Sequence, residues 1–418
     1  MHSTTTTAGT RRSWRQFSLR TLLLAMLVLS VCFALFAWRL QRARRQAAAV
    51  ATIRKLGGSI TYDYQRDARN GGTARADSPL PAWLIKWLGD DFFHDVVQST
   101  MHRQPPKSDA DVRAYWSTVS ELHQLEQFQA SGKWVNGRMA TEAVGGHLRL
   151  RELVLTGGNL RNSDLAPLAS LTNLETLTLY QSSIGDDAAK HLGNFPNLKQ
   201  ANLFSTNVGD RCIESLATGL QLEQLRLDSP QITDRALPHL AALPNLKFLM
   251  LSRTQVTDEG LRHLGRLTHL EVLGLAGTKI TDRGLVHLAP LVNLKTLDVQ
   301  QTQVTGSAFK ELQSLSKLES LCLLGNHTTD EGANWALKLP RLKGVDLAGP
   351  RLTMASLGQI EWPDSLEHVR FIGTDLTDDG LMRLTKCPNL RSVVVSGTKV
   401  TPEGIKRFQQ ARAGVNVH

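Results

Sequence analysis

The chain has 418 residues, of which 41% are hydrophobic and 21% are charged; its formal net charge is +10, and it contains four cysteines. This length allows a large folded core, and so few cysteines exclude a small disulfide-stapled domain. Residues 1–62 carry ten of the 48 basic residues and no acidic residue, which leaves 38 basic against 38 acidic residues elsewhere. The neutral remainder lacks the basic face that nucleic-acid binding requires, so no nucleic-acid partner is expected.

After a basic tail (residues 1–20), the first predicted element is a transmembrane helix over residues 21–38. This apolar run is about 27 Å long as a helix, close to the roughly 30 Å hydrocarbon core of a bilayer. Trp14 and Trp38 stand near its edges, where aromatic rings prefer to lie. A cleaved signal peptide is the alternative to this uncleaved signal-anchor, but four arginines separate the run from the small residues Ala47–Ala49. Basic residues flank both ends, so the orientation stays open.

Residues 39–81 are predicted to form a juxtamembrane helix and a linker. The helix should end at Gly57-Gly58, and Ser59–Tyr64 alternates as a short strand does. Asp67–Pro81 is predicted to be a polar loop, and Ala82–Gln98 an amphipathic helix.

Residues 82–149 are predicted to be an N-terminal cap with degenerate repeats, because a solenoid needs a cover for its first open core face. Within this cap, Leu125, Phe128, Ala130 and Val135 resemble a degenerate unit that begins 25 residues before Leu150.

Residues 150–418 contain an uninterrupted 24-residue repeat. A marker leucine recurs eleven times, at Leu150, Leu174, Leu198, Leu222, Leu246, Leu270, Leu294, Leu318, Leu342, Leu366 and Leu390. The fifth unit, from Leu246, serves as the type and reads LxxLxLxxTxVTDxGLxxLxxL. Its first part alternates as a strand does and its last part steps by three as a helix does, so each unit should be strand, turn and helix. Thr257 and Asp258 suit a helix start, and the same pair recurs in other units. Val415–Val417 is expected to close the C-terminal cap.

This pattern resembles the leucine-rich repeat family. The resemblance implies an α/β horseshoe solenoid with a parallel concave sheet and convex helices, here preceded by one transmembrane helix. The family often has Asn where this chain has Thr206, Thr254, Thr278, Thr302, Thr374 and Thr398. A Thr hydroxyl can still bond the backbone of the turn, so we expect the same fold.

A second resemblance covers nearly the whole chain. The segments FSLRTLLL (Phe17–Leu24), IRKLGGSITYDY (Ile53–Tyr64) and PAWLIKWLGDDFFHDVV (Pro81–Val97), followed by the repeats, are similar to the membrane-anchored leucine-rich repeat proteins of planctomycete bacteria. The resemblance implies a single-pass membrane protein of the cell envelope. It assigns no chemistry to these segments.

The residue after each marker leucine alternates in charge, from Arg151 and Glu175 through to Glu367 and Arg391. Neighbouring parallel strands lie about 4.8 Å apart, so the pattern predicts a row of exposed ion pairs along the array.

No catalytic, cofactor or metal site is predicted. His239, His263 and His287 share one repeat position, but neighbouring helices lie about 8 to 10 Å apart, too far for ligands of one zinc ion. The aspartates at the helix starts lack the oxygen pattern of calcium loops. The four cysteines form no CxxC pair, and the chain contains no GxSxG, P-loop, GxGxxG or HExxH motif.

The function predicted from this pattern is non-catalytic recognition of a protein or peptide in the concavity. Residues beside the strand leucines of units two to five should face it, and this candidate site comprises Tyr180, Asn202, Phe204, Arg226, Asp228, Phe248, Met250 and Arg253, with Thr178 and Ser252 in the same rows. Two alternatives stay open. One is an F-box-like substrate adaptor of a ubiquitin-ligase-type complex, because Ser78–Phe93 is faintly similar to the start of an F-box. The other is a purely structural envelope protein.

Overall fold

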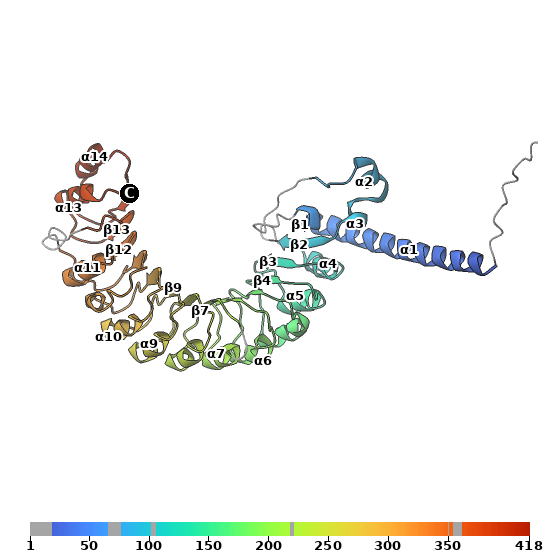
Figure 1. The fold of residues 1–418 in the computed structure, drawn as a ribbon, viewed down its shortest axis with the longest axis horizontal. Coiled ribbons are helices and arrows are strands. Elements are labelled where there is room, and N and C mark those ends of the chain that lie inside the picture. Colours follow the sequence, from blue (N-terminus) through green and yellow to red (C-terminus); the bar gives the residue numbers. More distant parts are fainter. Residues whose placement is uncertain (1–18, 66–76, 102–105, 218–220, 350, 354–361) are drawn as a thin grey trace, which may run out of the picture. The chain divides into compact units, whose positions relative to one another are not determined.

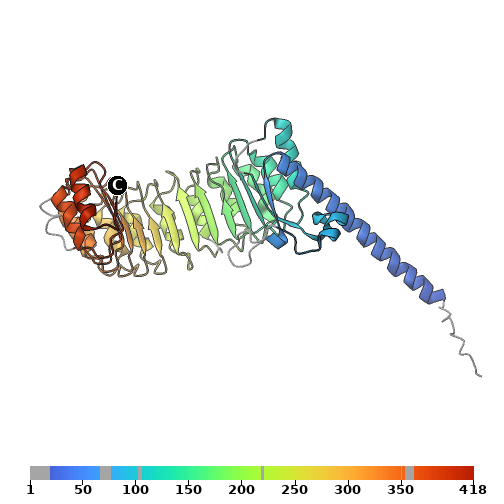
Figure 2. The same ribbon diagram turned by 90° about the horizontal axis from the view of Figure 1, so that it is seen from above.

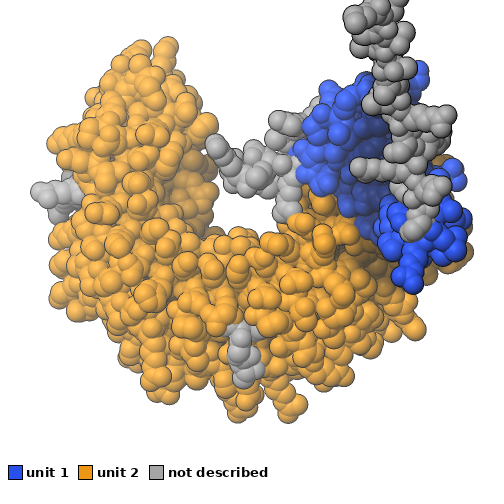
Figure 3. Space-filling view, turned by 45° about the vertical axis from the view of Figure 1, so that its right-hand side comes forward, with its two compact units in different colours: residues 1–51, 62–95 blue, residues 52–61, 96–418 orange. Residues whose placement is uncertain are grey.

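The computed structural model describes residues 19–65, 77–101, 106–217, 221–349, 351–353 and 362–418. The chain divides into two compact units (Figure 3), which we call the N-terminal unit (residues 1–51 and 62–95) and the solenoid unit (residues 52–61 and 96–418). Most of the predicted basic tail, including Trp14, lies outside the described residues, as does most of the loop predicted at Asp67–Pro81.

The N-terminal unit contains most of a single long helix, α1 (Leu19–Lys55), which covers both the predicted membrane run and the predicted juxtamembrane helix. Its most apolar window has a mean hydropathy of 2.5 and none of it is buried. The unit also holds η1 (Asp63–Gln65), α2 (Ala82–Leu88) and α3 (Asp90–Phe93).

The helix predicted over Ala82–Gln98 is wrong. Gly89 ends α2 with a φ of 83°, a left-handed value that favours glycine, and Val96 already begins a strand.

The solenoid unit is built on one sheet of 15 strands that lie side by side in chain order (Figures 1 and 2). The strands are β1 (Ser59–Tyr62), β2 (Val96–Met101), β3 (Gln127–Ser131), β4 (Glu152–Thr156), β5 (Thr176–Thr178), β6 (Gln200–Phe204), β7 (Gln224–Asp228), β8 (Phe248–Leu251), β9 (Val272–Gly274), β10 (Thr296–Asp298), β11 (Ser320–Cys322), β12 (Gly344–Ala348), β13 (His368–Ile372), β14 (Ser392–Val394) and β15 (Asn416–Val417). From β2 onward the pairing is parallel and, within the repeats, in register: Leu273 lies opposite Leu249 and Leu297.

In the described part of the solenoid unit, short helices between the strands lie on the convex side (Figure 1). They are α4 (Asp109–Val119), α5 (Gly137–Val144), η2 (Asn162–Ser170), η3 (Asp186–Ala188), α6 (Ala189–Leu192), α7 (Asp210–Ala217), η4 (Asp234–Ala236), α8 (Leu237–Leu240), α9 (Asp258–Leu264), α10 (Asp282–Leu285), η5 (Val286–Leu288), η6 (Ser307–Lys310), α11 (Asp330–Leu337), α13 (Asp378–Arg383), η7 (Leu384–Lys386) and α14 (Pro402–Ala411). The predicted fold class is confirmed: a parallel sheet is backed by helices, and one apolar helix precedes it.

The core of the solenoid unit lies between the sheet and these helices. All eleven marker leucines are buried there. The sheet begins before the first complete repeat, because β2 and β3 precede Leu150. Four aromatic side chains fill the core at this end, with neighbouring rings between 5.1 and 5.9 Å apart: Tyr115, Trp116, Phe128 and Trp134.

A hydrogen-bonded connection that we call the Asp–Thr staple joins successive repeats. The aspartate that opens one helix accepts the main-chain N–H and the hydroxyl of the threonine that precedes the next helix. Asp258, for example, accepts from Thr281 N at 2.7 Å and from Thr281 Oγ1 at 2.6 Å. The pairs are Asp210–Thr233, Asp234–Thr257, Asp258–Thr281, Asp282–Thr305, Asp330–Thr353 and Asp378–Thr401.

The staple explains the glycine in the TDxG motif. A Cβ atom on Gly284 would collide with the Asp258 carboxylate of the preceding repeat. At one joint the aspartate position is instead Gly306, with a φ of 93°. There the Thr329 N–H donates to the Thr305 carbonyl at 3.0 Å, and the backbones of Gly306 and Gly332 touch.

The threonines at the family's usual asparagine position bond the turn as expected. The hydroxyl of Thr254 donates to the Leu251 carbonyl at 2.8 Å, and the same bond recurs at Thr206, Thr278, Thr302 and Thr398. The buried hydroxyl of Thr374 has no hydrogen-bond partner among the residues that the structure describes. Asn326 holds this position in one repeat and bonds both Thr302 N and the Val299 carbonyl of the repeat before it.

Candidate binding site on the concave face

The sheet side of the solenoid unit is hollowed (Figure 3), and strands β5 to β8 cross it. Alternation along each strand sends the leucines into the core and the residues between them to the concave side. The eight residues predicted as a site come from these four strands and the turns after them. We call this set the concave cluster: Tyr180, Asn202, Phe204, Arg226, Asp228, Phe248, Met250 and Arg253.

Aromatic and arginine side chains of the concave cluster contact one another across neighbouring strands. The rings of Tyr180 and Phe204 stack with centroids 5.5 Å apart and an interplanar angle of 24°. The Arg253 guanidinium carbon lies 5.6 Å from the Phe204 ring centroid, and that of Arg226 lies 4.6 Å from the ring centroid of Phe248. These contacts hold flat, amphipathic groups in place before any partner arrives, which lowers the entropy lost on binding.

An ion pair fixes the position of Arg253. Its guanidinium lies 3.1 Å from Asp228 Oδ2, and the Asp228 side chain is only 8% exposed whereas that of Arg253 is 67% exposed. Burial raises the pKa of the Asp228 carboxyl, and the nearby Arg253 charge lowers it in part. Asp228 therefore supports the exposed arginine from below and offers little surface of its own to a partner.

Not every predicted residue is equally available. Met250 lies over Gly274 in the next strand, because a Cβ atom on that glycine would meet the Met250 sulfur and methyl group. Ser252, which shares the row, is buried. Tyr180, Phe204 and Phe248 are half-buried, and Arg226 is exposed. The accessible part of the concave cluster is thus aromatic and cationic.

The backbone beside the concave cluster adopts an unusual conformation. Gln181, Ser205, Arg253 and Gln301 have φ values of 54° to 55° although they are not glycines. Glycine occupies the same repeat position with positive φ at Gly157, Gly277, Gly325, Gly349, Gly373 and Gly397. Non-glycine residues in this region carry backbone strain, and such residues concentrate at functional sites. Three of the four border the concave cluster.

A shallow polar depression of about 200 Å³ adjoins the concave cluster on strands β5 to β7. Its polar lining consists of Thr176, Thr178, Gln200, Asn202, Gln224 and Arg226. The sequence-based prediction missed Thr176, Gln200 and Gln224, because in units two to four it included only the positions that directly follow the second and third strand leucines. The signal was present, since these three residues lie two positions earlier on the same strand face.

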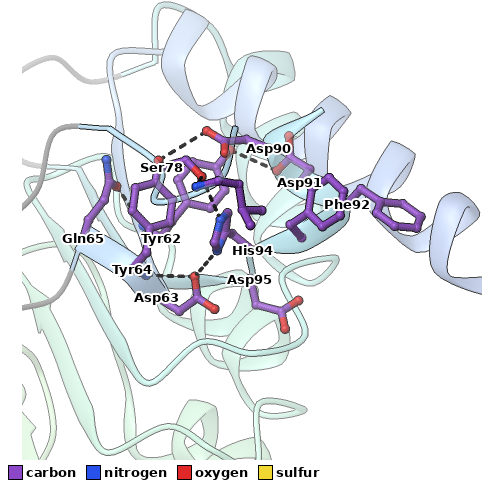
Figure 4. A network of polar contacts seen from close by, with 12 residues as sticks. Tyr62, Asp63, Tyr64, Gln65, Ser78, Asp90, Asp91, Phe92, His94 and Asp95 are labelled. Atoms are coloured by element: carbon purple, nitrogen blue, oxygen red, sulfur yellow. Dashed lines mark hydrogen bonds and ion pairs between the residues drawn. The ribbon is translucent and has the colours of Figure 1, made fainter. Parts of the chain in front are cut away.

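A polar network that sequence reasoning did not anticipate lies within the N-terminal unit (Figure 4). His94 Nε2 lies 3.0 Å from Ser78 Oγ, and His94 Nδ1 lies 3.0 Å from Asp63 Oδ1, which is the connectivity of a hydrolytic triad. The Leu80 N–H, however, donates to Ser78 Oγ itself at 3.3 Å, so this amide is not directed at a substrate oxygen. The Tyr64 ring lies against His94, with centroids 4.3 Å apart.

The same network joins three segments of the N-terminal unit. Gln46 of α1 donates to Asp91 Oδ1 at 3.0 Å and to the His94 carbonyl at 2.8 Å, and the Tyr62 hydroxyl also donates to Asp91. Arg42 pairs with Asp95 at 3.0 Å. These bonds tie η1 and α3 to the polar half of α1, which gives the network a structural role.

Other candidate chemistry stays apart in space. His239, His263 and His287 lie on α8, α9 and η5, and within the described part of the chain no group of three or more His, Cys, Asp or Glu side chains is arranged to hold a metal ion. The four cysteines are free thiols. Burial raises the pKa of Cys212 and Cys322 to about 12 and that of Cys387 to about 11, so these thiols stay protonated and unreactive near neutral pH.

Comparison with known proteins agrees with this geometry. The family model described as Leucine Rich repeat matches residues 242–265, 266–289 and 386–408. The array is a leucine-rich repeat solenoid. A search among curated proteins finds no match.

Three solved structures are similar to this leucine-rich repeat chain. An internalin (InlF) of Listeria monocytogenes has a TM-score of 0.52 at 20% identity, over 72% of this chain and 82% of its own. A leucine-rich repeat protein of Leptospira interrogans has a TM-score of 0.42 at 17% identity, over 76% and 100% of the two chains. Internalin C2 of Listeria monocytogenes has a TM-score of 0.36 at 26% identity, over 46% and 84%. The first likeness shows a shared fold.

Proposed function

We propose that this chain is a single-pass, membrane-anchored recognition module of the cell envelope that binds a protein or peptide through the concave cluster. The observation that carries the proposal is the linked set of Tyr180, Phe204, Arg253 and Asp228. Tyrosine and arginine are the residue types that most often dominate interface energies, and here they are held on a rigid sheet. The polar depression beside them offers hydroxyl, amide and guanidinium groups to the backbone of a bound chain.

The membrane half of the proposal rests on α1. Its large apolar side chains between Leu19 and Trp38 are exposed and have no apolar partner surface of their own in the described part of the chain except at Phe36, whose ring lies 5.5 Å from that of Phe92. A bilayer would cover them. The similarity of Phe17–Leu24, Ile53–Tyr64 and Pro81–Val97 to the planctomycete proteins supports an envelope location. The full chain is expected to stay in the membrane pellet through high-salt and alkaline washes; release by either wash would contradict the anchor.

The binding half is tested with a partner captured by the full chain in mild detergent. Tyr180→Ala, Phe204→Ala and Arg226→Ala should each weaken binding by about 1 kcal/mol or more, roughly fivefold. Trp335→Ala is the matched control, because it removes another aromatic ring beside a cation, Lys338, on the convex helix α11. Unchanged binding by all three concave variants would refute the site.

Each alternative makes a different prediction. An F-box-like adaptor would bind its scaffold through Ser78–Phe93, and the concave substitutions would leave that binding unchanged. A purely structural protein would capture no specific partner. An enzyme that uses Ser78 would react with a fluorophosphonate probe, and Ser78→Ala would abolish the label. We expect no label on Ser78, because its hydroxyl already accepts the Leu80 N–H.

A further inference from the structure

Helix α2 presents two exposed tryptophans. The side chains of Trp83 and Trp87 are 68% and 73% exposed. Residues four apart lie on the same side of a helix, so the two indoles form one apolar face. Among the described residues outside α1, the other exposed large apolar side chains are Leu148 at 59% and Val292 at 44%. A pair of exposed tryptophans on one short helix requires an explanation.

Contacts within the N-terminal unit fix α3 beside the end of the apolar run of α1. The rings of Phe36 and Phe92 lie 5.5 Å apart, and Arg39 Nε donates to the Phe92 carbonyl at 3.0 Å. Arg42 adds the ion pair with Asp95. All of these contacts involve the turns of α1 where the sequence changes from apolar to basic. Helix α2 is separated from α3 by Gly89 alone, so it stays near this level of α1.

The chemistry of this level matches the boundary between lipid and water. Tryptophan prefers the headgroup region, where its ring is in an apolar setting and its N–H reaches water. Trp38 lies at the same level, with the Arg42 guanidinium 5.8 Å from its ring centroid. Lys86, between the two indoles in sequence, adds a cation that anionic lipid headgroups attract.

We propose that Trp83 and Trp87 insert into the headgroup region of the bilayer beside α1, so that the N-terminal unit contacts the membrane surface as well as crossing it. This inference rests on the proposed membrane anchor. Two contacts instead of one would restrict rotation and tilt of the N-terminal unit against the membrane. The alternative occupant of the indole face is a protein partner, which the experiment below separates from lipid.

The experiment uses the full chain with Trp14→Phe and Trp38→Phe, reconstituted into phosphatidylethanolamine and phosphatidylglycerol vesicles. These vesicles carry a nitroxide quencher on the lipid headgroup or bromine atoms deep in the acyl chains. The headgroup quencher should reduce tryptophan emission more than the deep quencher does. Adding Trp83→Phe and Trp87→Phe should remove most of this quenching, whereas the control Trp335→Phe should leave it unchanged.

Vesicle flotation of the same samples separates failure of the lipid contact from failure of the anchor. If the chain floats and the Trp83→Phe, Trp87→Phe variant is quenched as strongly as its parent, the lipid contact is refuted while the anchor stands. If neither quencher reduces the tryptophan emission of the Trp14→Phe, Trp38→Phe chain, the lipid contact is also refuted. A protein partner is then the remaining occupant of the indole face. If the chain does not float, the anchor and the inference both fail.

Discussion

The helix starts on the convex side and the strand faces on the concave side of the solenoid unit follow opposite rules. At the helix starts the same Asp–Thr staple occurs six times with nearly the same distances, as in Asp234–Thr257 and Asp258–Thr281. On the concave side, the corresponding positions of neighbouring strands hold Asn202, Arg226 and Met250 in turn. Exact repetition is what stacking of identical units requires.

This difference separates scaffold from recognition within one chain. A residue that recurs every 24 positions is explained by its contact with the next repeat. A residue that departs from the repeat on an exposed, rigid face has no such explanation. The concave cluster departs from the repeat on such a face, and this is why we propose it as the binding site.

The largest effect should follow from a change in the repeated core. Leu273 in β9 is fully buried between Leu249 and Leu297. Leu273→Ala should lower the free energy of unfolding by about 2 to 5 kcal/mol, because it removes buried surface and leaves a cavity. Val292→Ala, at an exposed side chain, should change it by about 0.5 kcal/mol or less. Equal denaturant midpoints for both variants would contradict the core placement.

An unrepeated histidine at the start of the array should make stability depend on pH. Burial lowers the pKa of His147 to about 4, and the charge of His123 contributes. Because the folded pKa lies below the unfolded value of about 6.5, the folded state excludes the proton. Stability is therefore complete above pH 6.5 and falls as the pH drops toward 4, by about 3 kcal/mol.

The measurement compares the wild type with His147→Gln, which cannot take up the proton. The free energy of unfolding should fall between neutral and acidic pH in both chains, and it should fall further in the wild type than in the His147→Gln variant. Carboxylates elsewhere titrate in both chains and cancel in the comparison. Parallel pH profiles would show that His147 is not buried in its neutral form.

The staple should have an intermediate effect. Asp258→Ala leaves the N–H and hydroxyl of Thr281 without their acceptor, and we expect a loss of about 1 to 3 kcal/mol. Asp379→Ala is the control, because that carboxylate also opens a helix but is 88% exposed. Hydrogen exchange should locate the loss at the joint between α9 and α10. An equal loss in both variants would mean that Asp258 acts only through its own helix.

The exposed ion pairs should matter least. Glu271 and Lys295 lie 2.7 Å apart, and the Lys295 hydrogen bond lowers the Glu271 pKa, but both side chains are well solvated. Glu271→Gln should change stability by less than about 1 kcal/mol. The difference should vanish in about 1 M salt, where screening acts within a few ångströms. A larger loss of stability that persists in 1 M salt would contradict this and would show that the row of ion pairs stabilises the array.

The sequence predicted the repeated parts of the fold because the period itself carries the information. One inserted residue would have displaced every later leucine, so the intact spacing implied the register in which Leu273 meets Leu249 and Leu297. The same reasoning reached Asp258 but gave it an incomplete role. A carboxylate at a helix start can interact with the dipole of its own helix or accept hydrogen bonds from the threonine of the next repeat. The sequence is compatible with both roles, and the structure is needed to tell them apart.

The remainder of the candidate site depends on neighbours that no period reveals. Alternation placed Tyr180, Phe204 and Arg226 on the concave side, but the burial of Asp228 and the position of Met250 over Gly274 depend on how adjacent side chains pack. The network of Ser78, His94 and Asp63 is harder still, because it joins residues that occur once and lie up to 31 positions apart. A region without a repeat offers no regular spacing from which such contacts could be predicted.

The joint at Gly306 and Gly332 has a consequence for how the chain can diverge. At the joints held by an Asp–Thr staple, a mutation that removes the carboxylate is expected to weaken the joint. At this joint the two helix starts are connected by the backbone, through Thr329 N and the Thr305 carbonyl, and no carboxylate takes part in that bond. Truncation of a side chain does not remove this backbone hydrogen bond, whereas almost any substitution at either glycine adds an atom where Gly306 and Gly332 already touch. During evolution, this backbone connection should therefore tolerate mutations that shorten side chains. It should be disrupted by mutations that replace Gly306 or Gly332 with a larger residue.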